Sequence, residues 1–156
     1  MIFLWRIATD TPTYGADDLS GTGAARGGGR WNKVGTPALY TATSIALACV
    51  ETLVHLGAGS LPLNRYLVRI DVADDVWARR TRLAPAVGWD AIPPGFVSID
   101  AGQAWLVGGT AALLEVPSVV VPEESNIIVN PTHPDAGSLK ATRLRKWTYD
   151  ARFSGP

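Results

Sequence analysis

The chain of 156 residues is long enough for one domain with its own core, and its 47% hydrophobic and 18% charged residues exclude a disordered chain. Fourteen basic and fourteen acidic residues cancel, so the overall charge favours neither nucleic acid nor an anionic membrane surface as partner. One cysteine and two histidines are too few for a disulfide or a cysteine–histidine zinc site. These numbers predict a single domain over residues 1–156 without a metal centre.

The predicted elements are many short strands and few helices. Strands are expected where β-branched and apolar residues gather between turn residues, in chain order at 3–8, 38–42, 65–72, 112–116, 118–121, 126–131 and 144–150. Two helices are expected, at 44–56 with Thr43 as cap and Gly57 as stop, and at 99–107 with Ser98 as cap. Residues 10–37 and 81–97 are expected to be loops. The pattern favours an α+β fold around a bent mixed or antiparallel sheet with a few short helices.

No apolar run approaches the ~20 residues of a membrane span, and the first ten residues have no basic segment followed by a long apolar one. We therefore expect no membrane association and a cytoplasmic protein.

The stretch GAARGGGRWN, residues 23–32, joins glycines to a cation, an indole and an amide. It fits neither the dinucleotide fingerprint nor a phosphate-binding P-loop. Arg30 offers a fork of donors that matches a phosphate, Trp31 a flat apolar face and Asn32 a donor and an acceptor. The alternatives are a slack loop and, for the end of the stretch, the start of a strand with Trp31 in the core and Arg30 in solvent. Adjacent strand residues point to opposite faces, so only one of the two can face a given pocket.

Two further stretches carry polar side chains in apolar surroundings. In the helix at 44–56, Glu51 and His55 are four residues apart and share one face, which is either a solvated polar stripe or one side of a cleft. Ser125 and Asn126 follow two acidic residues at the start of a strand. No nucleophile elbow surrounds Ser125, so a ligand contact is the better functional interpretation.

Four stretches occur in a fixed order along nearly the whole chain: GGRWN, GTPALYTA, ALACVETLVH and VPSVVVPEESNIIVNPTHPD. Together they resemble the RES-domain family, the toxin half of a bacterial toxin–antitoxin pair, which is named after an arginine, a glutamate and a serine. On this resemblance the three residues are Arg30, Glu51 and Ser125, and Tyr40 lies in the second stretch. No role follows for Arg26 or His55.

The resemblance implies an ADP-ribosyltransferase-like fold and an enzyme that consumes NAD as a substrate and needs no other cofactor. Glu51 would face the positive charge that develops on the ribose, Arg30 would bind the diphosphate or an adjoining ribose, and Tyr40 would stack on nicotinamide or orient it. Ser125 would hydrogen-bond the nicotinamide ribose. The remaining residues expected to bind substrate are Trp31, Asn32 and Asn126.

The resemblance also implies a partner, an antitoxin with an Xre-type helix-turn-helix domain that obstructs the active site. The acceptor of ADP-ribose is left open by the residues. Water would make the protein an NAD glycohydrolase, a protein side chain would make it a mono-ADP-ribosyltransferase, and phosphate is a third acceptor. A non-catalytic nucleotide-binding module is the alternative from another class.

Overall fold

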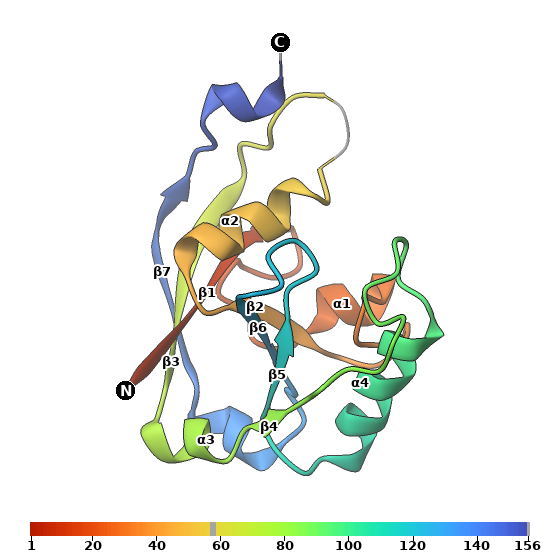
Figure 1. Ribbon diagram of the computed structural model, residues 1–156. Coiled ribbons are helices and arrows are strands. Elements are labelled where there is room, and N and C mark those ends of the chain that lie inside the picture. Colours follow the sequence, from red (N-terminus) through yellow and green to blue (C-terminus); the bar gives the residue numbers. More distant parts are fainter. Residues whose placement is uncertain (57–58, 156) are drawn as a thin grey trace.

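Seven strands form one sheet in the order β4-β5-β6-β2-β1-β3-β7 (Figure 1). The computed structural model describes residues 1–56 and 59–155. The strands are β1 (Ile2–Thr9), β2 (Leu39–Ala42), β3 (Arg65–Val72), β4 (Thr81–Arg82), β5 (Leu113–Pro117), β6 (Ser125–Val129) and β7 (Lys140–Trp147). Neighbouring strands are antiparallel, apart from the parallel pair β4 and β5. The predicted α+β class with a mixed sheet is confirmed.

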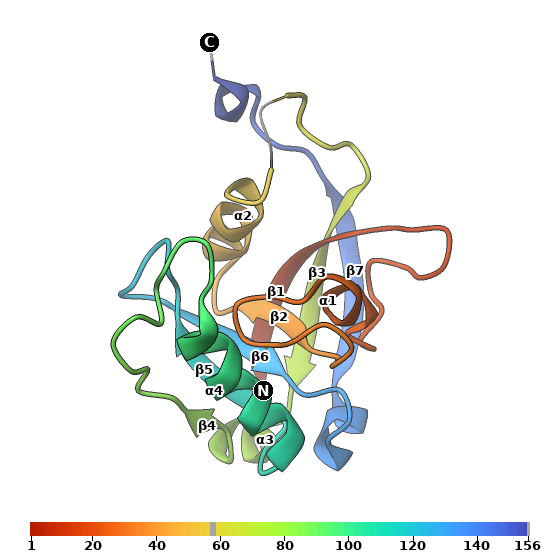
Figure 2. The same ribbon diagram turned by 90° about the vertical axis from the view of Figure 1, so that its right-hand side faces the viewer.

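Helices and loops cover both faces of this sheet. The helices are α1 (Thr22–Gly27), α2 (Ile45–Leu53), α3 (Asp74–Ala78) and α4 (Phe96–Gly108), with short 3₁₀ helices at Pro134–Ser138 and Ala151–Ser154. Figure 2 shows α2 and α4 on the same side of the sheet. Residues from the loop after β1, from α3 and from the first 3₁₀ helix pack against the other face.

Strand alternation divides the core between these two faces. On β6, Ile127 packs into the cluster that contains Leu4 and Ile70, whereas its neighbour Ile128 packs with Trp31 and with residues of α4. A third cluster joins α2 to the middle of β1 and β3. Since β6 is buried on both faces, its consecutive side chains pack alternately into the cores on the two faces of the sheet.

The sheet opens between β1 and β2. These strands share a single register pair, Trp5 with Ala42, whereas β1 pairs with β3 along all of its eight residues. Beyond that pair the two strands diverge, which leaves a gap in the plane of the sheet. The chain on both sides of this gap lines the cleft described below.

Several expected elements differ from those observed. The helix α1 lies inside the expected loop at 10–37, and the glycines that flank it, Gly21 and Gly28, both have positive φ angles. The prediction of a strand at 118–121 is wrong. Pro117 ends β5, and Ser118 begins a turn in which its hydroxyl accepts hydrogen bonds from two backbone N–H groups.

Element ends shift as well. Ser44 rather than Thr43 caps α2, with its hydroxyl accepting from the N–H of Leu47, and the expected stop at Gly57 lies outside the described residues. The second helix starts before the expected cap, so Ser98 is buried inside α4. The two-residue strand β4 lies within the expected loop at 81–97, and β7 begins and ends earlier than expected.

Candidate active site

The cleft between β1 and β2 consists of two connected chambers, of about 510 and 210 Å³. They share four lining residues, Arg6 and Ile7 from β1, Tyr40 from β2 and His55 just after α2. The larger chamber extends along the glycine-rich segment around α1, and the smaller one reaches Glu51 on α2. Two unequal spaces that meet where these shared residues lie suit an elongated ligand with a bulky half and a smaller half.

Glu51 is the acidic residue of the smaller chamber. Its Oε1 accepts two hydrogen bonds, from the hydroxyl of Ser118 at 2.7 Å and from the amide Nδ2 of Asn126 at 2.5 Å. Among the described residues no hydrogen bond reaches its Oε2. One carboxylate oxygen is thus fixed by the protein, and the other is left for a ligand in the chamber.

Ser118 holds this arrangement from a fully buried position. While its hydroxyl donates to Glu51, the same oxygen accepts from the N–H groups of Val120 at 3.1 Å and Val121 at 3.0 Å. Its own N–H donates to the carbonyl of Glu124, which closes the turn between β5 and β6. The sequence prediction missed Ser118, although it lies in the same stretch as the serine that was chosen.

Ser125 lies elsewhere. Its hydroxyl donates to Glu115 at 3.2 Å, and Glu115 in turn accepts from Arg80 at 2.6 Å. Ser125 and Asn126 are consecutive residues of β6, so their side chains point to opposite faces of the sheet. Because Asn126 reaches Glu51 and lines the smaller chamber, Ser125 is turned away from that chamber.

Tyr40 lines both chambers, while its hydroxyl is engaged with the glycine-rich segment. The hydroxyl accepts from the N–H of Trp31 at 2.9 Å and donates to Oδ1 of Asn32 at 2.8 Å. Burial raises the pKa of Tyr40 above its ordinary value. A Cβ at Gly29 would lie 2.6 Å from this hydroxyl, so the close approach of the two segments requires a glycine there.

Trp31 and Asn32 are both buried, and neither lines a chamber. Trp31 belongs to the apolar cluster beneath α4 and stacks on Trp89, with ring centroids 6.1 Å apart. The amide of Asn32 donates to three backbone carbonyls, those of Ala24, Lys33 and Thr36. Their contacts hold the loop in place, and they do not face the cleft.

Arg30 supports a neighbouring loop. One of its terminal nitrogens donates to the carbonyls of Trp89 at 2.9 Å and Ala91 at 2.8 Å, and the residue does not line either chamber. Burial lowers the pKa of Arg30, and the negative charge of Glu51 is the first of the effects that oppose this shift. Contact of Arg30 with a diphosphate stays a prediction.

Arg6 is the cation at the junction of the two chambers, and the sequence prediction missed it. Its side chain donates, among the described residues, to the carbonyl of Asp18 at 3.2 Å. Burial lowers the pKa of Arg6 to about 10, with only partial compensation by the charges of Asp18 and Tyr14. A guanidinium so poorly compensated is suited to an anionic ligand. The available signal was a charged residue in the middle of an otherwise apolar strand.

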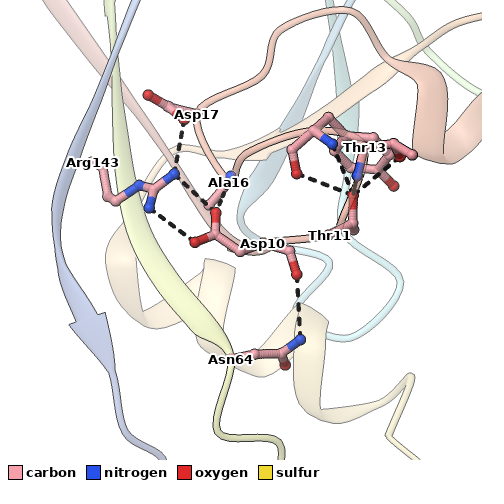
Figure 3. A network of polar contacts seen from close by, with 8 residues as sticks. Asp10, Thr11, Thr13, Ala16, Asp17, Asn64 and Arg143 are labelled. Carbon is pink, nitrogen blue, oxygen red and sulfur yellow. Dashed lines mark hydrogen bonds and ion pairs between the residues drawn. The ribbon is translucent and has the colours of Figure 1, made fainter.

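The wall of the larger chamber opposite β2 is the loop after β1, which a cluster of ionic contacts attaches to β7 (Figure 3). Arg143 on β7 bridges Asp10 at 2.9 Å and Asp17 at 3.2 Å, and Asp10 also accepts from the N–H of Ala16 at 2.7 Å. Tyr14, between the two aspartates, lines the chamber. The position of this wall thus depends on a residue from the far end of the chain.

Within residues 1–56 and 59–155, no group of three histidine, cysteine or acidic side chains lies close enough to hold a metal ion. Over the same residues, no helix has both the length and the apolar character that crossing a membrane requires.

The fold and the cleft together place the chain in a known class. The RES domain matches residues 3–152, so the chain belongs to the RES-domain family. A Sphingobium protein named Prs ADP-ribosylating toxin is 58% identical over 152 residues, which cover 96% of this chain and 94% of the relative. A Pseudomonas putida protein named Toxin Res is 38% identical over 155 residues, which cover 97% and 99%.

A solved structure shares the fold. It is the crystal structure of the M. tuberculosis MbcT–MbcA toxin–antitoxin complex, and the aligned chain has a TM-score of 0.65 at 23% identity, with 92% of this chain and 84% of that chain covered.

Proposed function

We propose that this protein is the toxin of a toxin–antitoxin pair and that it cleaves NAD at the bond between nicotinamide and ribose. The observation that carries the proposal is the carboxylate of Glu51, fixed through one oxygen by Ser118 and Asn126 at the inner end of a two-chamber cleft. The names of the two relatives support the toxin role, and the name of the Sphingobium protein supports chemistry on ADP-ribose.

To cleave the bond between nicotinamide and ribose, the protein has to bind NAD and stabilise the positive charge that forms on the ribose. Breaking the bond leaves positive charge on the ribose, as in glycoside hydrolysis, while nicotinamide departs as a neutral molecule and needs no general acid. The free oxygen of Glu51 would accept a hydrogen bond from a ribose hydroxyl and face the developing cation. Fixing the other oxygen in advance lowers the cost of orienting this group during the reaction.

We assign the smaller chamber to the nicotinamide riboside half and the larger chamber to the ADP half. The diphosphate would then lie at the junction, within reach of Arg6, and Tyr40 would present its ring to the nicotinamide side. Arg30 would act by holding the loop of Trp89 and Ala91 and by its charge beside Glu51.

The acceptor of ADP-ribose separates two versions of this proposal. Water as acceptor gives NAD hydrolysis and depletion of NAD. A protein as acceptor gives mono-ADP-ribosylation, which the name Prs ADP-ribosylating toxin favours for the Sphingobium relative. Incubation with labelled NAD and either buffer, phosphate or cell extract separates the versions, because only transfer to protein leaves label on a protein band.

The partner in this proposal is an antitoxin of the Xre helix-turn-helix type that blocks the cleft in the cytoplasm. The MbcT–MbcA complex, in which a chain of the same fold was solved, is a toxin–antitoxin complex, and it supports an antitoxin partner. Expression of the toxin alone should arrest growth, and co-expression with a helix-turn-helix antitoxin, sought in the gene next to the toxin gene, should restore it. Growth arrest that persists in co-expression would contradict the pairing.

A further inference from the structure

Arg65 is a second cation of the cleft, at a distance from Glu51. It is the first residue of β3 and pairs in register with Thr9, the last residue of β1. Arg65 and Thr9 line the larger chamber and not the smaller one. Arg6 and Thr9 are three residues apart on β1, so their backbones are separated by roughly 10 Å and their side chains leave opposite faces of the strand.

The guanidinium of Arg65 lacks a protein partner within the described part of the chain. Its Nε is buried and without a hydrogen bond, and no ion pair joins Arg65 to an acidic residue of ranges 1–56 and 59–155. Arg69 on the same strand bonds Asp71 at 2.7 Å, and Arg143 on the next strand bonds two aspartates. A buried donor without an acceptor is costly and rare in native proteins, so it calls for an explanation.

The acidic side chain of the larger chamber does not serve as that acceptor. Asp18 uses its Oδ2 for the N–H and the hydroxyl of Ser20, and its carbonyl for Arg6. The lining of the larger chamber therefore carries two arginines, Arg6 on β1 and Arg65 on β3, against one aspartate whose Oδ2 is already engaged.

We propose that Arg65 binds a phosphate group carried by the adenosine half of the dinucleotide. Phosphates are the anionic groups of such a ligand, and the fork of an arginine matches their geometry. With the diphosphate at the junction within reach of Arg6, a cation further along the same chamber meets the adenosine 5′-phosphate side of that diphosphate, or the 2′-phosphate that NADP carries in addition. The inference rests on the proposed use of the cleft for NAD, and it adds the residue that selects for the adenosine phosphate.

Calorimetric binding measures this directly, in the Glu51→Gln protein so that no ligand is consumed. The probes are 5′-AMP, adenosine 2′,5′-bisphosphate and nicotinamide mononucleotide. Arg65→Gln should weaken the binding of an adenosine phosphate by about 10-fold or more, the usual effect of losing a charge-assisted hydrogen bond. Nicotinamide mononucleotide should bind with unchanged affinity, since its phosphate would lie near Arg6.

Two further variants exclude trivial causes. Arg152→Gln removes an exposed arginine remote from the cleft lining and should leave all three affinities unchanged. Arg65→Lys keeps the charge but loses the fork, so its affinity for adenosine phosphates should be intermediate, and it replaces Arg65→Gln if that variant does not fold.

Each result has one meaning. If Arg65→Gln loses affinity for 5′-AMP, Arg65 binds the 5′-phosphate. If it loses affinity for the bisphosphate alone, Arg65 binds a 2′-phosphate. Both results support the inference. Unchanged adenosine affinities, or an equal loss for nicotinamide mononucleotide or in Arg152→Gln, overturn it. If the unmodified protein releases no nicotinamide yet Arg65 controls adenosine phosphate binding, the proposed function fails and the phosphate site stands.

Discussion

Replacing Ser118 by alanine removes one of the two donors that hold the carboxylate of Glu51. Ser118 is fully buried and makes three hydrogen bonds through its hydroxyl, to Glu51, from Val120 and from Val121. Losing a hydrogen bond to a charged acceptor and leaving two backbone N–H groups unsatisfied should lower the free energy of unfolding by about 2–4 kcal/mol. The protein should still fold, because the apolar clusters on both faces of the sheet are untouched.

The effect on activity should be distinct from the effect on stability. With only Asn126 left on Oε1, the carboxylate loses orientation, and we expect about a 10- to 100-fold lower kcat with a smaller change in KM, which corresponds to roughly 1.4–2.7 kcal/mol. The assay is nicotinamide release from NAD at a temperature at which thermal melts show the variant folded. Asn126→Ala should act in the same direction, because it removes the other donor.

Ser125→Ala is the matched control for this measurement. It removes a hydroxyl seven residues further along the same segment, where the partner is Glu115 rather than Glu51. We expect kcat within about twofold of the unmodified protein and a stability loss of about 1 kcal/mol or less. If Ser125→Ala abolished activity while Ser118→Ala retained it, the assignment of Ser118 to the site would be wrong.

Three other consequences are measurable. Gly102→Ala places a Cβ 2.1 Å from a main-chain carbonyl and should cost several kcal/mol in a denaturant melt, whereas Gly108→Ala, with open space around it, should stay within about 1 kcal/mol. Arg143→Ala should raise KM more than it lowers kcat and should speed hydrogen exchange over residues 10–18, because the loop loses its ion pairs to β7. Arg79 also bridges two carboxylates but lies outside the cleft lining, so Arg79→Ala should change neither the kinetics nor this exchange. Because burial raises the pKa of Tyr40, alkaline absorbance titration between about pH 9 and 11 should give the same tyrosinate signal in Tyr40→Phe as in the unmodified protein, and a signal lower by about a quarter would contradict this.

The pattern of apolar residues was enough to predict most of the sheet. The strand expected at 65–72 is β3 as observed, and residues 3–8 and 38–42 match β1 and β2 closely. These segments are bounded by turn residues and packed into the core, so propensity and burial act in the same direction. The strand expected at 118–121 fails for a local reason, since its valines follow Pro117 and a serine whose hydroxyl competes for backbone N–H groups.

The candidate site was only partly predictable, because the motifs report residue types and not the direction of side chains. Glu51, Tyr40 and Asn126 do line the cleft. Ser125 and Asn126 could not both face Glu51, since they are consecutive residues of one strand.

The arginine that lines the cleft was also hard to predict from the sequence. Arg30, beside the glycines, was expected to bind a phosphate, whereas a glycine at position 29 allows the close approach of the Tyr40 hydroxyl. The cation at the centre of the cleft is Arg6, and its exposure to the chambers depends on the separation of β1 from β2, which no local pattern indicates.

The most direct test of the proposed function compares nicotinamide release by the purified, antitoxin-free protein with release by Glu51→Gln. The substitution keeps the size of the side chain and an oxygen that can accept from Ser118 and Asn126, so the melting temperature should change little. We predict turnover by the unmodified protein, in buffer or in the presence of cell extract, and a loss of at least about 1,000-fold in Glu51→Gln, roughly 4 kcal/mol of transition-state stabilisation. Equal rates in the two proteins, or no release by the unmodified protein under any of these conditions, would contradict it.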